Sequence, residues 1–158
     1  MLTLLESSLP IRTIVLAGVT NNLLSAVDAY ERGTKHNYPE LTEEQIKYRW
    51  SEASEIAKKR LDFVARASEV VKRQAIPAML FVHGSQDEVF PVNQIEELYK
   101  TIAQHYEEEN QSERLCLKIF ENLEHQIDLE AAKNSPDLKQ DITQLQQVVT
   151  DWFNQNLC

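Results

Sequence analysis

Glycine and cysteine are scarce in this chain of 158 residues, which contains three glycines and two cysteines. No serine or cysteine stands in a Gly-x-Ser-x-Gly turn, the motif that presents a nucleophile between a strand and a helix. Cys116 and Cys158 have neither zinc-ligand spacing nor the pattern of a disulfide framework. The chain therefore lacks a recognisable nucleophile motif, and its cysteines predict a reducing compartment, the cytoplasm.

Long apolar runs and an excess of basic residues are missing as well. The sequence has no run of about 18 apolar residues, the length of a membrane helix, and its first residues lack the features of a secretory signal. Sixteen basic and 25 acidic residues give a net charge of -9, which repels phosphate backbones and anionic lipids. We therefore expect neither nucleic acid nor a membrane as a partner.

The rest of the sequence is that of one globular domain, residues 1–158, with 42% hydrophobic and 26% charged residues. Three short apolar runs alternate with stretches of helical pattern, which predicts an α/β fold with a parallel sheet. Strands are expected at residues 13–19, 78–82 and 115–120. Helices are expected at 23–30, across most of 41–74 behind a capping box of Thr42 and Gln45, after Pro91, and after Ser135.

Two polar residues follow neighbouring strands of this predicted sheet. Asp87 comes after the second strand and His125 comes after the third. Because right-handed crossovers bring the carboxyl ends of parallel strands to one edge, these side chains should lie close together. A carboxylate beside an imidazole fixes its tautomer and leaves the other ring nitrogen free to act as a base. The sequence therefore predicts an acid–base pair at the carboxyl edge of the sheet.

Four segments resemble the C-terminal half of an α/β-hydrolase, in the esterase and prolyl-oligopeptidase-like branch of that family. The segment HGSQDEVFP is similar to the exit of the seventh strand, with the triad acid at Asp87. LKIFENLEHQID is similar to the eighth strand and the triad-histidine loop, with His125. TIVLAGVTNN resembles the sixth strand, and VVTDWFNQNL resembles the closing helix. The resemblance implies a partial α/β-hydrolase fold in which residues 41–74 are a helical cap-like insertion.

The resemblance also implies an activity, the hydrolysis of carboxylic esters or peptides by a catalytic triad without a cofactor. Asp87 would orient His125, and His125 would deprotonate a serine. The serine elbow of the family would lie just upstream of Met1, so we expect this chain to be a truncated and inactive part of such an enzyme. One residue departs from the family pattern, because Glu124 stands before His125 where the family commonly has glycine.

Each of these residues also has a plainer interpretation. Aspartate often closes a turn before a helix, which would explain Asp87, and His125 would then be a surface loop histidine. His83 is expected to fill space and hydrogen-bond its loop, and Ser85 to be a turn hydroxyl, so neither is predicted to be catalytic. No metal site is predicted, because the histidines lack partners with ligand spacing.

A second hypothesis is a non-catalytic interaction module. A three-stranded sheet that ends at residues 13–19 exposes the unpaired edge of that strand. Such an edge is a template for pairing with another chain. Under this hypothesis the chain forms a homodimer or binds a partner through the exposed sheet edge.

Overall fold

One parallel sheet organises the part of the chain that the computed structural model describes, residues 1–50 and 55–157. Its strands are β1 (Thr13–Ala17), β2 (Ala78–Gly84) and β3 (Leu115–Phe120), hydrogen-bonded in the order β1-β2-β3 and parallel throughout. The predicted α/β class, with about three parallel strands flanked by helices, is confirmed. Cys158 and residues 51–54 of the expected helical region lie outside the described residues.

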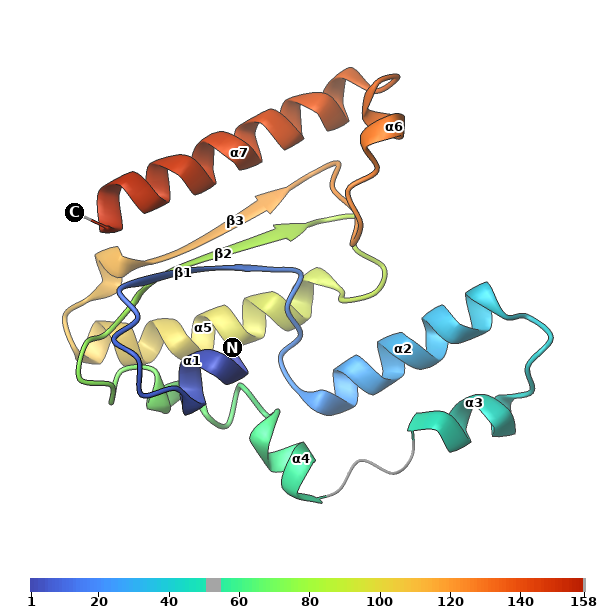
Figure 1. Ribbon diagram of the computed structural model, residues 1–158, viewed down its shortest axis with the longest axis horizontal. Helices are drawn as coiled ribbons and strands as arrows, with labels where there is room; N and C mark the ends of the chain where they lie inside the picture. The colour runs from blue at the N-terminus through green and yellow to red at the C-terminus, as the bar shows by residue number, and fades with distance from the viewer. Residues whose placement is uncertain (51–54, 158) are drawn as a thin grey trace.

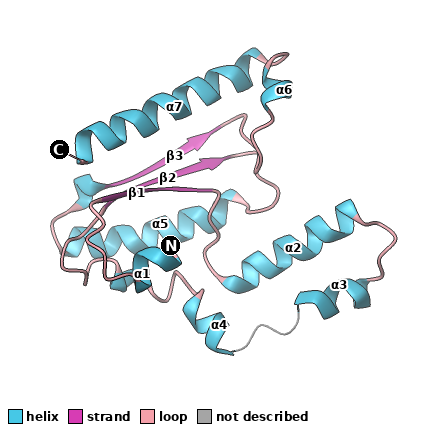
Figure 2. Ribbon diagram, viewed as in Figure 1, coloured by secondary structure: helices cyan, strands magenta, loops and turns pink. Residues whose placement is uncertain are grey.

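Helices cover both faces of the sheet. α5 (Val92–Glu108) and the short α1 (Leu2–Glu6) lie on one side, and α7 (Pro136–Asn156) lies on the other (Figure 1). The remaining helical elements are α2 (Leu23–Asn37), α3 (Glu43–Trp50), α4 (Glu55–Arg60), α6 (Leu129–Ala132) and the 3₁₀ turns η1 (Ala67–Glu69) and η2 (Ser112–Arg114) (Figure 2). No helix in the described ranges is long and apolar enough to cross a membrane.

The central strand β2 is buried along its whole length and divides the core in two. Met79 and Phe81 point into the core under α5, whereas Leu80 and Val82 point into the core under α7 with Trp152. This alternation follows from the two-residue period of a strand. Removing each of these large apolar side chains from water stabilises the fold by about 1.5–3 kcal/mol, so β2 is the axis of the structure.

Helix starts follow the side chains that the sequence offers. Ser135 caps α7 by accepting a hydrogen bond from the backbone N–H of Leu138 (3.3 Å), and Pro136 occupies the first helical turn. The capping box before α3 is reciprocal: the N–H of Gln45 donates to the hydroxyl of Thr42 (3.2 Å), and the N–H of Thr42 donates to the amide oxygen of Gln45 (2.9 Å). Both predicted starts, and the predicted limits of β3, are confirmed.

Three predicted limits are wrong, each for a local reason. The helix expected at 23–30 continues as α2 to Asn37, because Gly33 lowers helix stability by only about 1 kcal/mol relative to alanine and does not end the helix. β1 ends at Ala17 and not at residue 19, because Gly18 turns the chain with a φ of 54°. β2 runs two residues further than expected and ends at Gly84, which pairs with Phe120.

The expected helical region 41–74 is only partly helical. It contains α3, α4 and the 3₁₀ turn η1, and the chain between Leu61 and Arg66 follows turns. The apolar positions of this stretch still pack on the core, because Phe63, Ala67 and Val70 are buried under the same side of the sheet as α5. The apolar residues expected to form the helical stripe included Leu61, Val64 and Val71, which are only half-buried against this core. The helical spacing therefore overstated the length of regular helix and did not select these three buried residues.

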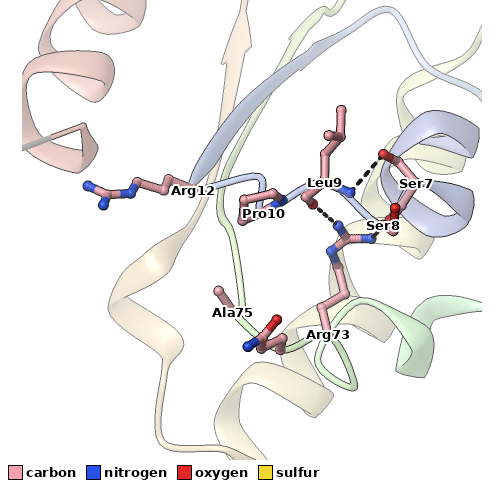
Figure 3. Close-up of a pocket in the computed structure, with 8 residues that line it drawn as sticks. Ser7, Ser8, Leu9, Pro10, Arg12, Arg73 and Ala75 are labelled. Carbon is pink, nitrogen blue, oxygen red and sulfur yellow. Dashed lines mark hydrogen bonds between the residues drawn. The ribbon is translucent and has the colours of Figure 1, made fainter.

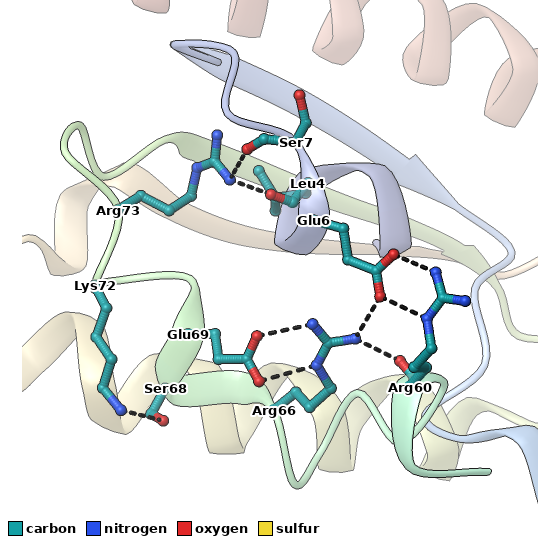
Figure 4. Close-up of polar contacts among 9 residues, drawn as sticks. All are labelled: Leu4, Glu6, Ser7, Arg60, Arg66, Ser68, Glu69, Lys72 and Arg73. Atoms are coloured by element: carbon teal, nitrogen blue, oxygen red, sulfur yellow. Dashed lines mark hydrogen bonds and ion pairs between the residues drawn. The ribbon is translucent and has the colours of Figure 1, made fainter. Parts of the chain in front are cut away.

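A cluster of charged side chains holds α1 against the segment that follows α4 (Figure 4). We call Glu6, Arg60, Arg66, Glu69 and Arg73 the N-terminal clamp. Glu6 binds Arg60 and Arg66, and Arg66 also forms two hydrogen bonds with Glu69 of 2.8 and 2.9 Å. Arg73 donates to three backbone carbonyls, those of Leu4, Ser7 and Leu9. The clamp thereby fixes the chain that leads into β1.

Candidate functional site

Asp87 lies in the turn that follows β2, and its two carboxylate oxygens have different partners. Oδ1 accepts hydrogen bonds from the backbone N–H groups of Val89 (2.9 Å) and Phe90 (2.8 Å), which closes the turn before α5. Oδ2 lies 3.1 Å from Nδ1 of His125. The side chain of Asp87 is 2% exposed. Asp87 therefore closes its turn through Oδ1 and pairs with His125 through Oδ2.

His125 lies in the loop that follows β3, so the predicted meeting of the two strand exits is confirmed. Because an ionised carboxylate only accepts hydrogen bonds, the hydrogen between the two side chains is on Nδ1. Nε2 then carries a lone pair, and it has no hydrogen-bond partner in the described ranges of the chain. The imidazole is 32% exposed, so the ring is partly open to solvent. Such a ring can take a proton from a nucleophile.

Neighbouring groups fix the plane and position of the imidazole. The ring of Phe90 meets it edge-on, with centroids 5.1 Å apart and an interplanar angle of 78°. On the β1 side, a Cβ built on Gly18 would lie 3.7 Å from Nδ1 and Cε1 of His125, so the imidazole packs directly beside the backbone of β1's exit. The loops after all three strands therefore contribute to the site.

The loops that carry Asp87 and His125 are joined through their backbones. Gly84 has no room for a side chain, because a Cβ there would lie 2.0 Å from the carbonyl oxygen of Leu123. Beyond this contact, the N–H of Ser85 donates to the carbonyl of Phe120 (2.8 Å) and the N–H of Gln86 donates to that of Leu123 (3.1 Å). The distance between Asp87 and His125 is thus set by two loops that are joined to each other by backbone hydrogen bonds.

His83 supports the turn from inside the core. Its side chain is fully buried, and Nε2 donates to the carbonyl of Phe90 (2.8 Å) while lying 3.7 Å from Oδ2 of Asp87. A carbonyl only accepts, so Nε2 carries the hydrogen, and Nδ1 is a buried nitrogen without a partner among the described residues. The prediction that His83 hydrogen-bonds its own loop is confirmed.

No nucleophile stands beside the pair among the side chains that the structure describes. The hydroxyl of Ser85 donates to the carbonyl of Glu121 (2.8 Å), so Ser85 is a turn residue, as predicted. Among the described side chains, no hydroxyl or thiol forms a hydrogen bond with Nε2 of His125. The same ranges contain no group of three or more His, Cys, Asp or Glu side chains suited to a metal ion.

Sequence reasoning missed the contacts that fix the loop after β1. Asn21 is buried and donates to the carboxylate of Glu97 on α5 (2.5 Å), and the hydroxyl of Thr20 donates to the side-chain oxygen of Gln94 (3.2 Å). These contacts tie the loop beside Gly18 to the helix that follows the Asp87 turn. The only signal in the sequence is a pair of asparagines after an apolar run, which indicates a turn but not its partner.

Hollows open at both ends of the sheet. Beside the pair, a pocket of about 70 Å³ has Gly18, Asp87 and His125 in its wall, and a groove of about 470 Å³ passes His125 on its open side. A third hollow, of about 590 Å³, lies at the opposite end, before β1 and β2, and Arg12 and Arg73 are among its lining residues (Figure 3). The guanidinium of Arg73 there donates to the backbone carbonyls of Ser7 and Leu9.

Comparisons with protein-family models, with curated proteins and with solved structures found no match to this chain. The function proposed below therefore rests on the geometry of the site.

Proposed function

We propose that this chain supplies the acid and the general base of a serine hydrolase that acts on carboxylic esters or short peptides. The observation that carries the proposal is the 3.1 Å hydrogen bond between Nδ1 of His125 and a buried oxygen of Asp87, in a ring that is 32% exposed and whose Nε2 has no partner among the described residues. A surface loop histidine needs no buried carboxylate behind it. The arrangement therefore favours a proton-transfer role for His125.

In the proposed reaction, Nε2 of His125 accepts the proton of a serine hydroxyl while the serine oxygen attacks the carbonyl carbon. The imidazolium that forms is stabilised by the carboxylate of Asp87, which stays ionised. His125 then gives the proton to the leaving alcohol or amine, and an acyl-enzyme remains. Water attacks the acyl group with the same exchange of a proton at Nε2, which releases the carboxylic acid and restores the serine.

The proposal assigns the serine to a polypeptide segment other than the described residues, because none of their hydroxyls contacts Nε2. The open edge of β1 is the docking place for such a segment, since a strand added there would continue the sheet. Gly18 has no side chain to stand between that segment and the imidazole of His125. By itself, the 158-residue chain is expected to hydrolyse neither esters nor peptides.

The test uses the protein isolated from its source under native conditions, with any polypeptide that is attached or bound to it. A fluorophosphonate probe should label one serine, located by mass spectrometry outside the 158 residues. His125→Ala and Asp87→Asn should each lower the labelling rate about 10⁴-fold. His105→Ala is the matched control, because His105 also faces a carboxylate, that of Glu108 at 3.2 Å, but lies on α5 away from the pair.

Two results would contradict the proposal. Labelling of Ser85, or of any other serine in this chain, would show that the nucleophile has been assigned to the wrong segment. A native protein that the probe does not label, or that keeps its labelling rate after His125→Ala, would overturn the role of the pair.

The open edge of β1 favours a second candidate function, self-association without catalysis. Backbone groups of Arg12 and Gly18 bond to β2. By the alternation along a strand, the N–H and C=O groups of Thr13, Val15 and Ala17 then point to the open side. β1 has no charged side chain, whereas β3, the other edge strand, carries Lys118, a residue type that discourages edge pairing. We propose β1 as the pairing edge of a homodimer.

Light scattering on the purified chain tests this second candidate. Val15→Pro removes one outward N–H without touching the bonds to β2, so it should convert a dimer to a monomer, whereas Val15→Ala should not. If the unmodified chain is monomeric at every concentration measured, the second candidate is wrong.

A further inference from the structure

The groove of about 470 Å³ beside His125 has walls from three parts of the chain. His36 comes from α2, Glu88 comes from the loop after β2, and Glu124 comes from the loop after β3. A hollow of about 390 Å³ shares His36 and Glu88 with this groove and continues along α2. Small-molecule sites in proteins have volumes of about 300–1,000 Å³, so the groove is large enough for a substrate.

A hydrogen bond joins α2 to the turn that carries Asp87. A guanidinium nitrogen of Arg32 lies 3.4 Å from the carbonyl oxygen of Val89, to which it donates. Arg32 lines the neighbouring hollow, and no lysine or arginine is among the residues that line the groove itself. The helix therefore forms one wall without bringing a positive charge to the side of His125.

Two free carboxylates give the groove a negative charge. Glu88 and Glu124 are exposed and stand on different loops, and neither forms an ion pair within the described part of the chain. The other titratable side chains of the groove are His36 and His125. Glu124 stands where the resembled hydrolase family commonly has glycine, so its carboxylate is a feature of this chain and not of that family.

We infer that the groove selects substrates with an ammonium or guanidinium group close to the bond that is cleaved, and that Glu88 and Glu124 determine this specificity. A cation between the two carboxylates is attracted by both, whereas an anion is repelled by both. The cleavage in this statement rests on the proposed function of His125, but the binding of the cation depends on the groove alone.

Three probes of nearly the same shape test the charge preference on the purified chain: benzamidine, which is a cation, benzamide, which is neutral, and benzoate, which is an anion. Binding is followed by the backbone amide shifts of Val89 and Gln126 in ¹H–¹⁵N spectra. Benzamidine should bind more tightly than benzamide, and benzoate should bind least. Glu88→Gln and Glu124→Gln should each weaken benzamidine binding about threefold, as expected for exposed charges, and the double variant about ninefold.

Two controls separate the groove from general surface charge. Glu113→Gln removes an exposed carboxylate from η2, at the other end of β3, and should leave benzamidine binding unchanged. His125→Ala should also keep the preference for benzamidine, because the preference comes from the carboxylates. Equal binding of the three probes, or benzamidine binding that is insensitive to both glutamate variants, would overturn the inference.

The outcome is distinguishable from that of the proposed function. If the fluorophosphonate labels the native protein but the three probes bind equally, the hydrolase proposal stands and the specificity is wrong. If benzamidine binds as expected but no serine is labelled, the cation groove stands and the hydrolase proposal is wrong.

Discussion

The N-terminal clamp and the Asp87–His125 pair differ in whether all of their polar groups have partners. In the N-terminal clamp, Glu6 binds Arg60 and Arg66, and the guanidinium of Arg73 donates to backbone carbonyls (Figure 4). At the other end of the sheet, Asp87 is equally saturated, but Nε2 of His125 has no partner in the described ranges. A closed network holds the chain in place, whereas one free nitrogen on a fixed ring is available for chemistry.

The two clusters also differ in what holds their side chains in place. The clamp joins segments through long side chains that are partly exposed, from 16% for Arg66 to 54% for Arg60. The pair is joined through backbone hydrogen bonds and one glycine, which set its geometry within narrow limits. Rigidity at the site therefore comes from the main chain. Substitutions at Gly84 and in the clamp compare the two regions.

Gly84→Ala should have the largest effect. A methyl group at this position would meet the carbonyl of Leu123 at 2.0 Å, so the loops of Asp87 and His125 would have to separate. We expect a loss of about 3 kcal/mol in the free energy of unfolding, the upper end for overpacked sites, measured by urea denaturation. The His125 resonances should also shift, because the ring loses its fixed partner.

Gly33→Ala is the matched control for this change. A Cβ at Gly33 would meet nothing within 4 Å, and the residue lies inside α2, so alanine should stabilise the protein by up to about 1 kcal/mol. If both glycine variants are equally stable, the close approach of the two loops does not hold the site.

Arg73→Met should have an intermediate effect. The substitution keeps most of the aliphatic stem and removes three hydrogen bonds to the chain before β1, so we expect a loss of about 2 kcal/mol. Arg12→Met is its control from the same hollow (Figure 3), because Arg12 is exposed and its side chain makes no hydrogen bond in the described ranges. Its effect should stay within about 0.5 kcal/mol. Equal losses would contradict the role of the clamp.

Acid should weaken the clamp slightly. Hydrogen bonds from Arg60 hold the pKa of Glu6 below its usual value of 4.5, and those from Arg66 do the same for the pKa of Glu69. A lowered carboxyl pKa means that the stabilising contribution is present above pH 4.5 and is lost as the pH falls through the lower, folded-state pKa. The effect is small because water and salt screen these exposed groups.

The matching measurement is the urea midpoint at pH 7 and at pH 3, for the unmodified chain and for Glu6→Gln with Glu69→Gln. The double variant should be slightly less stable at pH 7 and should lose less stability on acidification. An identical pH dependence in both proteins would show that the clamp carboxylates do not contribute.

The sequence predicted the parts of this structure that depend on local pattern. β3 and α7 begin at the expected residues, since an apolar run and a Ser-Pro cap specify them without help from the rest of the chain. The meeting of Asp87 and His125 was also predictable, because parallel topology alone brings two strand exits together.

The remaining features depend on partners that are distant in the sequence. Arg73 lies 69 positions from Leu4, and Asn21 lies 76 positions from Glu97, and no spacing rule connects such residues. The close approach of Gly84 to Leu123 was not predictable either. A glycine at the end of a strand can mark a bulge, a bend or a close contact, and the sequence does not tell which. The function of the pair stays a prediction until the labelling experiment is done.

The two oxygens of Asp87 hold different groups, one the backbone of its own turn and the other a ring nitrogen. A glutamate would bring the same charge on a longer stem, and it would satisfy one of these partners at the expense of the other. Acidity alone is therefore not what this position requires. The carboxylate must be carried by a single methylene, so replacing Asp87 by glutamate would change the geometry of the site.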